Sequence, residues 1–294
     1  MNYLQKFDFK NLDSDKSDIL DFNRKFGYVV IENVFEKKHC DEMKNRAYHL
    51  VKKDQTSNTV GFSLKKNKHY SSNNFLSSAY KINNFYEDKM INKDGTFKDK
   101  KINCISKLGH CLHDVDLIFK KYSYHDRIKK IIKLTNLSKP ILNQSSYIFK
   151  QPLVGGEYLW HQDSTYLLTN PLSCLALWIA IDDANEKNGC LIVKPFSHNE
   201  KIRKRVKHIK GKVIKEKLVN KEWDENNNIP LSVKTGSIII FDGSLAHKSS
   251  ENFSKQSRNT YVMHFFDNNC KYSKENWLQR PLNFPFKNFY ETFN

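Results

Sequence analysis

The chain has 294 residues, 39% of them hydrophobic and 20 of them phenylalanine. This is enough apolar surface for a sizeable core and excludes a chain that is disordered throughout. Its longest apolar run, 174–181, is far shorter than the roughly 20 residues that cross a bilayer, and no apolar secretory core follows Met1. We therefore expect a soluble, cytoplasmic protein. The net charge is +17, but lysines and asparagines are spread over the whole chain, which argues against a nucleic-acid stripe.

The first part of the chain shows mainly helical patterns. Ile19, Phe22 and Phe26 recur at intervals of three and four residues, and Gly27 is placed to end this first helix. A short β-rich run, 28–34, then precedes a second helix. The apolar positions of the second helix are Cys40, Met43, Ala47 and Leu50.

Residues 54–100 are polar, rich in asparagine and serine, and weakly periodic, so we expect loops there. Two helical patterns follow this region. The apolar positions of the first pattern are Leu108, Cys111, Leu112, Val115 and Phe119, and those of the second are Ile128, Ile131, Ile132 and Leu134. The six cysteines show no C-x-x-C spacing, so we expect reduced thiols and no zinc site made of cysteines.

From Ile141 onward, short apolar runs are separated by turn signals such as Asn188-Gly189 and Asp242-Gly243. This pattern predicts a mainly β fold, a double-stranded β-helix or jelly roll, with the N-terminal helices packed on one outer face. No Pro- or Gly-rich linker divides the chain. We therefore expect a single domain over 1–294, mainly helical in 1–140 and mainly jelly roll in 141–294.

The most basic segment is 201–217. Charge runs of this kind are usually solvated connections between strands, which is the interpretation we favour. The alternative is an electrostatic attraction for a phosphate-bearing substrate such as an acyl-CoA. Nucleic acid ranks third, because no aromatic residue is interleaved in the most basic part of the run to stack on bases.

An imidazole and a carboxylate lie two residues apart at His161 and Asp163, in a run that is typical of a strand. Side chains at positions i and i+2 of a strand point to the same side, so the two residues offer a metal one nitrogen and one oxygen. His247 is the best candidate for a third ligand. Two histidines and one carboxylate, with the other positions open, form the facial triad of non-haem Fe(II) oxygenases.

Arg258 opens a further strand-like run, 258–266, shortly after His247. A guanidinium is planar and binds a carboxylate through two parallel hydrogen bonds, so this arginine suits a cosubstrate carboxylate next to the metal. The remaining histidines are not needed as ligands. His264, on the strand of Arg258, is a candidate neighbour of the ligands.

In these motifs and their order the chain resembles the phytanoyl-CoA dioxygenase family of Fe(II)/2-oxoglutarate oxygenases, and most of all its domain-containing protein 1 branch. The resemblance spans most of the chain. It is carried by Phe26-Gly27-Tyr28-Val29-Val30-Ile31, Lys107-Leu108-Gly109-His110, Tyr147-Ile148-Phe149-Lys150-Gln151-Pro152, Trp178-Ile179-Ala180, Asn188-Gly189-Cys190-Leu191 and Glu275-Asn276-Trp277-Leu278-Gln279.

The resemblance implies an enzyme that binds Fe(II) through His161, Asp163 and His247, and that consumes 2-oxoglutarate and O₂ with release of succinate and CO₂. Relatives that halogenate have lost the carboxylate, so Asp163 favours hydroxylation. The implied substrate is a small or lipid-like molecule, with an acyl-CoA as one option.

For the cosubstrate, the resemblance assigns the distal carboxylate of 2-oxoglutarate to Arg258, assisted by Ser249. It places Lys107, Ser146 and Trp178 in the wall of the pocket. Position 146 is a methionine in relatives, so Ser146 would make that wall smaller and more polar.

Two other classes of function stay open. A zinc-dependent hydrolase also uses two histidines and a carboxylate, but it gives Arg258 no role. A basic, non-enzymatic binding protein would show steeply salt-dependent binding and would have no need for His161. Production of succinate that depends on iron separates these alternatives from the oxygenase.

Overall fold

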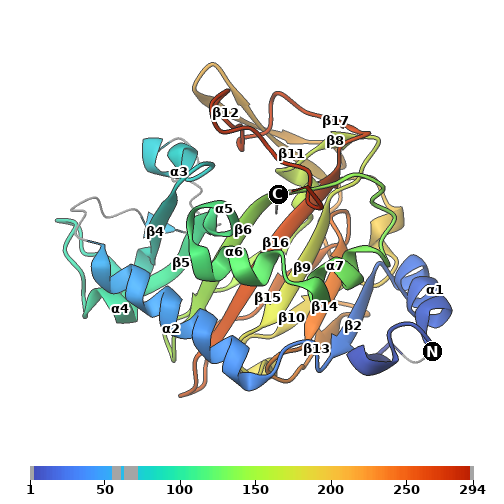
Figure 1. Cartoon of the computed structure of the whole chain (residues 1–294). Helices are drawn as coiled ribbons and strands as arrows, with labels where there is room; N and C mark the ends of the chain where they lie inside the picture. Colours follow the sequence, from blue (N-terminus) through green and yellow to red (C-terminus); the bar gives the residue numbers. More distant parts are fainter. Residues whose placement is uncertain (1–2, 55–60, 63–71, 292–294) are drawn as a thin grey trace.

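The computed structural model describes residues 3–54, 61–62 and 72–291, and its strands form two main sheets (Figure 1). The spatial order of the larger sheet is β1 (Lys6–Asp8), β2 (Tyr28–Glu32), β14 (Ile238–Asp242), β9 (Leu175–Ala180), β16 (Arg258–Asp267), β6 (Pro140–Lys150), β5 (Ile105–His110), β4 (Ile82–Glu87) and β3 (Gly61–Phe62). The order of the smaller sheet is β13 (Ile229–Leu231), β10 (Leu191–Val193), β15 (His247–Ser249) and β7 (Tyr158–His161). Two short pairs join β11 (Lys204–Ile209) to β12 (Lys212–Lys217) and β17 (Lys271–Tyr272) to β8 (Thr169–Asn170).

The central strands β9 and β16 are buried at every position, because both faces of the larger sheet are covered. Helices α2 (Lys37–Lys53), α6 (Leu117–Ser123) and α7 (Asp126–Ile132) lie across one face (Figure 1). The smaller sheet faces the other side, and one cavity is lined by residues of both sheets. Strands covered on both faces carry continuous apolar sequences, which explains the short apolar runs after Ile141. The expected fold class, mainly β with helices over one face, is confirmed.

The N-terminal helices follow the predicted pattern. In α1 (Lys16–Phe26) the buried residues are Ile19, Phe22 and Phe26. Gly27 ends this helix at φ 82, a left-handed conformation that glycine adopts without steric cost. The second expected helix is α2, in which Cys40, Met43 and Ala47 are buried as predicted, whereas Val51 is buried in place of Leu50. The shorter helices are α3 (Asn73–Ser77), α4 (Lys101–Cys104) and α5 (Leu112–Val115), with 3₁₀ turns η1 (Phe9–Asn11), η3 (Asp88–Met90), η4 (Asp163–Thr165), η5 (Glu186–Asn188) and η6 (Ser197–Asn199).

Two expectations for the region before Pro140 are wrong. Residues 82–87, expected as loop, form β4, and Leu108, expected on a helix, lies in β5. Strand β5 is buried along its whole length between β4 and β6, so its apolar residues reflect burial in a sheet and not helical periodicity. The part of the loop prediction that covers 55–60 and 63–71 lies outside the described residues. The N-terminal part thus adds strands β1 to β5 to the larger sheet as well as helices.

The basic segment forms a hairpin that connects β10 to β13 of the smaller sheet, and most of its side chains are exposed or half-buried. Strands β11 and β12 pair in antiparallel register, and Arg205 and Val206 on β11 are buried. Three of its lysines form surface ion pairs: Lys207 with Glu216 at 2.8 Å, and Lys204 and Lys217 with Glu222 at 3.2 Å each. Because the two buried residues of β11 are adjacent, the segment lacks the alternation of buried and exposed side chains that marks a strand in a sequence.

None of the helices in the described parts of the chain is long and apolar enough to cross a membrane. All six cysteines are free thiols, and five of them are buried, as the absence of paired spacings predicted.

Candidate functional site

Two histidines face each other across the smaller sheet. His161 ends β7 and His247 begins β15, and the antiparallel register of these strands pairs the two residues directly. Their ring centroids are 4.1 Å apart. Directly opposed side chains lie on the same face of a sheet. This pairing therefore brings together the imidazoles of two residues that are 86 positions (247 − 161) apart in the sequence.

Asp163 joins the histidines by a different route from the expected one. It lies at the start of the 3₁₀ turn η4 and not on the strand of His161. The turn is anchored by Gln162, whose side chain donates to Ser244 O at 2.7 Å, and by Ser164, whose backbone N–H donates to Gly243 O at 2.9 Å. The carboxylate therefore points back toward the histidines, and the ligand atoms of all three residues lie within 4.8 Å of one another.

Hydrogen bonds orient both imidazoles for metal binding. Nδ1 of His161 is 2.7 Å from Leu159 O, and Nδ1 of His247 is 3.0 Å from Leu245 O. A carbonyl oxygen only accepts, so Nδ1 carries a proton in each ring, and in a neutral imidazole Nε2 is then the nitrogen with the lone pair. Burial, together with the neighbouring His161, lowers the pKa of His247 to about 4. This imidazole is therefore neutral at physiological pH, which is the form that binds metals.

The two oxygens of Asp163 have different neighbours. Oδ1 is 3.6 Å from His161 Nε2 and 3.8 Å from His247 Nε2, whereas Oδ2 is 3.0 Å from His264 Nε2. Burial opposes ionisation of this carboxyl, but His264 and His247 outweigh burial and hold its pKa below the usual range. The donor set is one carboxylate oxygen and two imidazole nitrogens, which fits a divalent metal such as Fe(II).

Arg258 is a buried cation in the same cavity as the three candidate ligands. Its side chain is fully enclosed, at 1% exposure, and burial lowers its pKa to about 10, so it stays charged at neutral pH. Nη1 donates to Thr260 Oγ1 at 3.0 Å, and the guanidinium lies 5.4 Å from the ring centroid of Trp178. Nε is buried without a partner, and no carboxylate of the described residues pairs with this arginine. A buried guanidinium without a carboxylate of the described residues beside it is suited to bind the carboxylate of a ligand.

The remaining predicted residues, Lys107, Ser146, Trp178 and Ser249, line this same cavity of about 130 Å³. The structure thus brings all eight predicted site residues together in one cavity. Burial lowers the pKa of Lys107 to about 7. Its ammonium lies 5.4 Å from the ring centroid of Phe85 and 5.9 Å from that of Phe75.

Sequence analysis missed the apolar wall of the cavity. Phe75, Tyr166, Leu167 and Trp277 contribute to this wall, and Phe75 packs against Trp277 with ring centroids 4.3 Å apart. Phe75 lies in a region expected to be loop, and Trp277 lies in a C-terminal stretch without regular structure. Only long-range packing brings them together, so no local periodicity could have found them.

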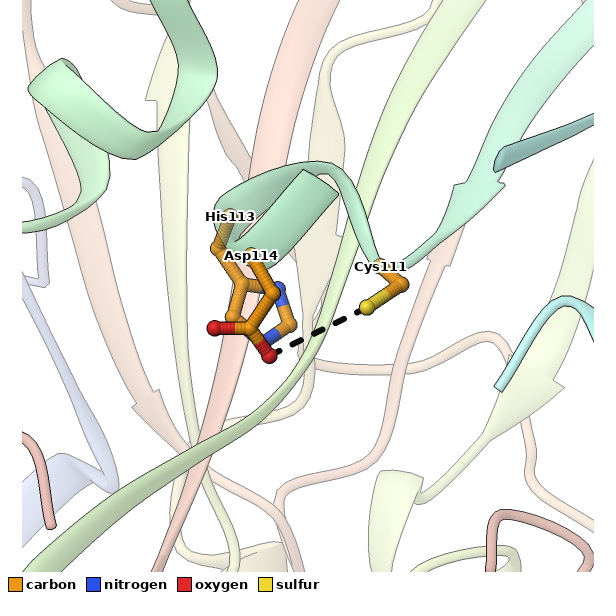
Figure 2. Close-up of side chains that lie close together, drawn as sticks. All are labelled: Cys111, His113 and Asp114. Carbon is orange, nitrogen blue, oxygen red and sulfur yellow. Dashed lines mark hydrogen bonds and ion pairs between the residues drawn. The ribbon is translucent and has the colours of Figure 1, made fainter. Parts of the chain in front are cut away.

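A second cluster of potential ligands, Cys111, His113 and Asp114, surrounds the start of α5 (Figure 2). Here Arg280 already interacts with the atoms that could bind a metal. Its Nη2 is 3.1 Å from Asp114 Oδ2 and 3.3 Å from His113 Nε2. Burial raises the pKa of the Cys111 thiol to about 12, so the sulfur stays protonated and interacts with the Asp114 carboxylate at 3.8 Å. A guanidinium already neutralises this carboxylate, so the cluster does not suit a metal.

The chain is similar to known proteins over most of its length. The family model "Phytanoyl-CoA dioxygenase (PhyH)" matches residues 23–260. "Phytanoyl-CoA dioxygenase" of Arabidopsis thaliana is 36% identical over 265 residues, covering 90% of this chain and 93% of the relative. The "Phytanoyl-CoA dioxygenase domain-containing protein 1 homolog" of Caenorhabditis elegans is 34% identical over 285 residues, covering 92% and 99%.

A solved structure shares the fold at low sequence identity. The epimerase SnoN, in complex with Fe³⁺, alpha ketoglutarate and nogalamycin RO, superimposes with a TM-score of 0.60 at 12% identity, covering 93% of this chain and 98% of SnoN. This likeness concerns the fold alone. The family model and the curated relatives identify the enzyme class: the chain belongs to the phytanoyl-CoA dioxygenase family, as the sequence motifs predicted.

Proposed function

We propose that this protein is an Fe(II)- and 2-oxoglutarate-dependent dioxygenase that hydroxylates a small or lipid-like molecule and releases succinate and CO₂. One observation carries the proposal: a single cavity contains both a three-residue metal cluster and a buried arginine without a carboxylate partner. A metal and an anionic cosubstrate would satisfy both. A solved structure with this fold holds that pair of cofactors, and the paired strands of both halves favour one catalytic domain over 1–294.

In this mechanism His161, Asp163 and His247 hold Fe(II). Arg258 binds the distal carboxylate of 2-oxoglutarate, with Ser249 beside it, and its guanidinium is kept in place by Thr260. When bound, Fe(II) and 2-oxoglutarate supply the oxidising chemistry, in which O₂ is consumed and one C–H bond of the substrate is hydroxylated. The apolar wall around Phe75 and Trp277 excludes water from the reacting centre.

The decisive experiment loads the purified protein with Fe(II) and 2-oxoglutarate without oxygen. We expect the visible charge-transfer band of a 2-oxoglutarate chelate, followed by succinate release once oxygen is admitted together with a metabolite extract. The matched controls are the zinc-loaded protein and His161→Ala, neither of which should release succinate. Succinate production that is equal with zinc, or no band with Fe(II), would refute the oxygenase.

The finer proposal concerns an anionic tail on the substrate, such as that of an acyl-CoA. A groove next to the cavity shares His161 and Tyr166 with it, and is lined by Lys204, Lys215 and Lys217. Lys204 and Lys217 both pair with Glu222 at 3.2 Å, so Lys215 carries most of the available charge. Arg205 is excluded from this role, because its buried guanidinium donates to Thr165 O at 3.0 Å and to Asn276 Oδ1 at 2.8 Å.

Coenzyme A is the probe for this groove. We expect its dissociation constant to rise with ionic strength, since exposed charges are screened beyond about 8 Å at physiological salt. Lys215→Gln should weaken binding roughly twofold to fivefold at low salt, the size of one exposed ion pair. Lys129→Gln on α7 is the matched control. Equal affinity in the Lys215 variant at all salt concentrations would remove the groove from substrate binding.

A further inference from the structure

His264 contacts the metal cluster without belonging to it. It is a buried residue of β16, with 7% of its surface exposed. Strand β16 pairs with β6, and this pairing places His264 opposite Gln144. Its Nε2 meets Asp163 Oδ2 at 3.0 Å, and its Nδ1 meets Gln144 Nε2 at 3.4 Å. The ring is therefore held on both sides by groups of the protein.

These contacts determine where the proton of His264 resides. An ionised carboxylate only accepts hydrogen bonds, so Nε2 of His264 carries a proton and donates it to Asp163. The lone pair of Nδ1 then accepts from the amide of Gln144. Neither nitrogen of His264 has a lone pair directed at the metal cluster, and this excludes His264 as a fourth ligand.

We propose that His264 is the positioning residue that makes Asp163 a ligand through one oxygen only, an assignment that rests on the proposed function. Oδ1 faces Nε2 of both His161 and His247, while the hydrogen bond from His264 holds Oδ2 away from them. A carboxylate that was free to turn would offer both oxygens and occupy a further coordination position. 2-Oxoglutarate and O₂ need the positions that remain.

The position of His264 in the fold supports this role. Strand β16 lies between β9 and β6 in the larger sheet, so its backbone is fixed on both sides. Arg258, Val262 and His264 are an even number of positions apart on β16, so their side chains lie on the same face of the sheet. All three line the cavity. One rigid strand therefore carries both the arginine that suits the cosubstrate and the histidine that orients the metal-binding carboxylate.

The experiment measures Co(II) binding to the metal-free protein by its visible d–d absorption, which requires no turnover. Removing a partner that orients a metal ligand typically weakens metal binding roughly 10- to 100-fold, which is the loss we expect for His264→Leu. His264→Gln keeps an N–H donor near the place of Nε2 and should recover most of the affinity. Gln144→Leu should have a smaller effect of the same sign.

The matched control is Val262→Ala, which alters the same strand and the same cavity wall and should leave the Co(II) affinity within about threefold of wild type. We also expect the Co(II) spectrum of His264→Leu to change shape, because the carboxylate becomes free to supply its second oxygen. A merely structural role would lower the melting temperature of the metal-free protein, without a change of spectrum and without rescue by His264→Gln. That result, or unchanged Co(II) affinity in His264→Leu, overturns the proposal. If the wild type itself fails to bind Co(II), the proposed function falls instead.

Discussion

Two clusters in this molecule have nearly the same ingredients. One combines His161, Asp163 and His247 with the buried Arg258, and the other combines Cys111, His113 and Asp114 with the buried Arg280. In the second cluster the arginine is 3.1 Å from the carboxylate. In the first, no ion pair joins Arg258 to any carboxylate of the described residues.

This difference determines what each cluster can do. Where Arg280 neutralises Asp114, the charge is balanced within the protein and the ion pair fastens the C-terminal segment to α5. Where Arg258 stays apart from Asp163, the carboxylate is left for a cation and the arginine for an anion. A list of ligand types within reach of one another is therefore insufficient to identify a metal site. The identification of a metal site must also consider where the nearest buried cationic side chain lies.

Loss of a carboxylate should affect metal binding in one cluster only. Asp163→Ala leaves two imidazoles and should weaken Fe(II) or Co(II) binding by more than about 100-fold, beyond the range for residues that only orient ligands. Asp114→Ala should retain wild-type metal content, because its cluster holds a guanidinium. Equilibrium dialysis with metal analysis measures both, and circular dichroism checks that each variant folds. Full iron content in Asp163→Ala would show that the triad is wrong.

Loss of an arginine should affect stability in the second cluster. Arg280→Leu leaves Asp114 buried without its cation, which typically costs about 3 to 5 kcal/mol of unfolding free energy. The double variant Asp114→Asn with Arg280→Leu should recover much of this loss, because it removes both charges. Urea unfolding measures the free energy, and Co(II) affinity should be unchanged in both variants. If Arg280→Leu were as stable as wild type, the ion pair between Arg280 and Asp114 would not be what holds the C-terminal segment against α5.

The corresponding change in the first cluster should affect cosubstrate binding. Arg258→Ala should weaken 2-oxoglutarate binding by roughly 2 to 5 kcal/mol, as for truncating one partner of a buried charge pair. Arg258→Lys keeps the charge but not the planar fork, so it should recover only part of the loss. The charge-transfer band of the anaerobic Fe(II) complex gives the dissociation constant, and Fe(II) binding should survive both changes. A shift below threefold in Arg258→Ala would point to Lys107 as the cation that holds the cosubstrate.

The sequence predicted the candidate residues better than the way they meet. His161, Asp163, His247 and Arg258 follow from residue type, spacing and family motifs, and all line one cavity. The 3₁₀ turn that carries Asp163 was mistaken for a strand, because a spacing of two residues between His161 and Asp163 is compatible with a continuing strand and with a strand that ends in a turn. Arg280 and Asp114 are 166 positions (280 − 114) apart in the sequence. Ion pairs between such distant residues leave no local sequence pattern.

The sequence also identified the fold class while misplacing some of its parts. The jelly roll follows from the short apolar runs after Ile141, and α1 and α2 follow from their periodic apolar residues. Strands β4 and β5 were missed, because a short strand in a polar region, or beside helices, has too few residues to show its period. The hairpin of the basic segment was missed because its residues are mostly charged and its buried positions do not alternate.

The smallest expected effect separates the two cations of the cosubstrate cavity by pH. Burial lowers the pKa of Lys107 to about 7 and that of Arg258 to about 10, so of these two cations it is Lys107 that changes charge between pH 6 and pH 9. The rings of Phe75 and Phe85 lie beside its ammonium, and the other titratable groups that line the cavity include His110, His264 and Tyr158.

The sign follows from the binding of a dianion. Below pH 7 Lys107 is already protonated and attracts 2-oxoglutarate, whereas above pH 7 binding must recruit a proton to this side chain. The dissociation constant should therefore rise with pH, by roughly tenfold in total, which corresponds to one pKa unit of coupling. Lys107→Met should bind more weakly at pH 6 and flatten the profile, whereas Lys129→Met should retain the wild-type profile. If the slope persisted in Lys107→Met, the pH dependence would originate elsewhere and Arg258 alone would provide the cation for the cosubstrate.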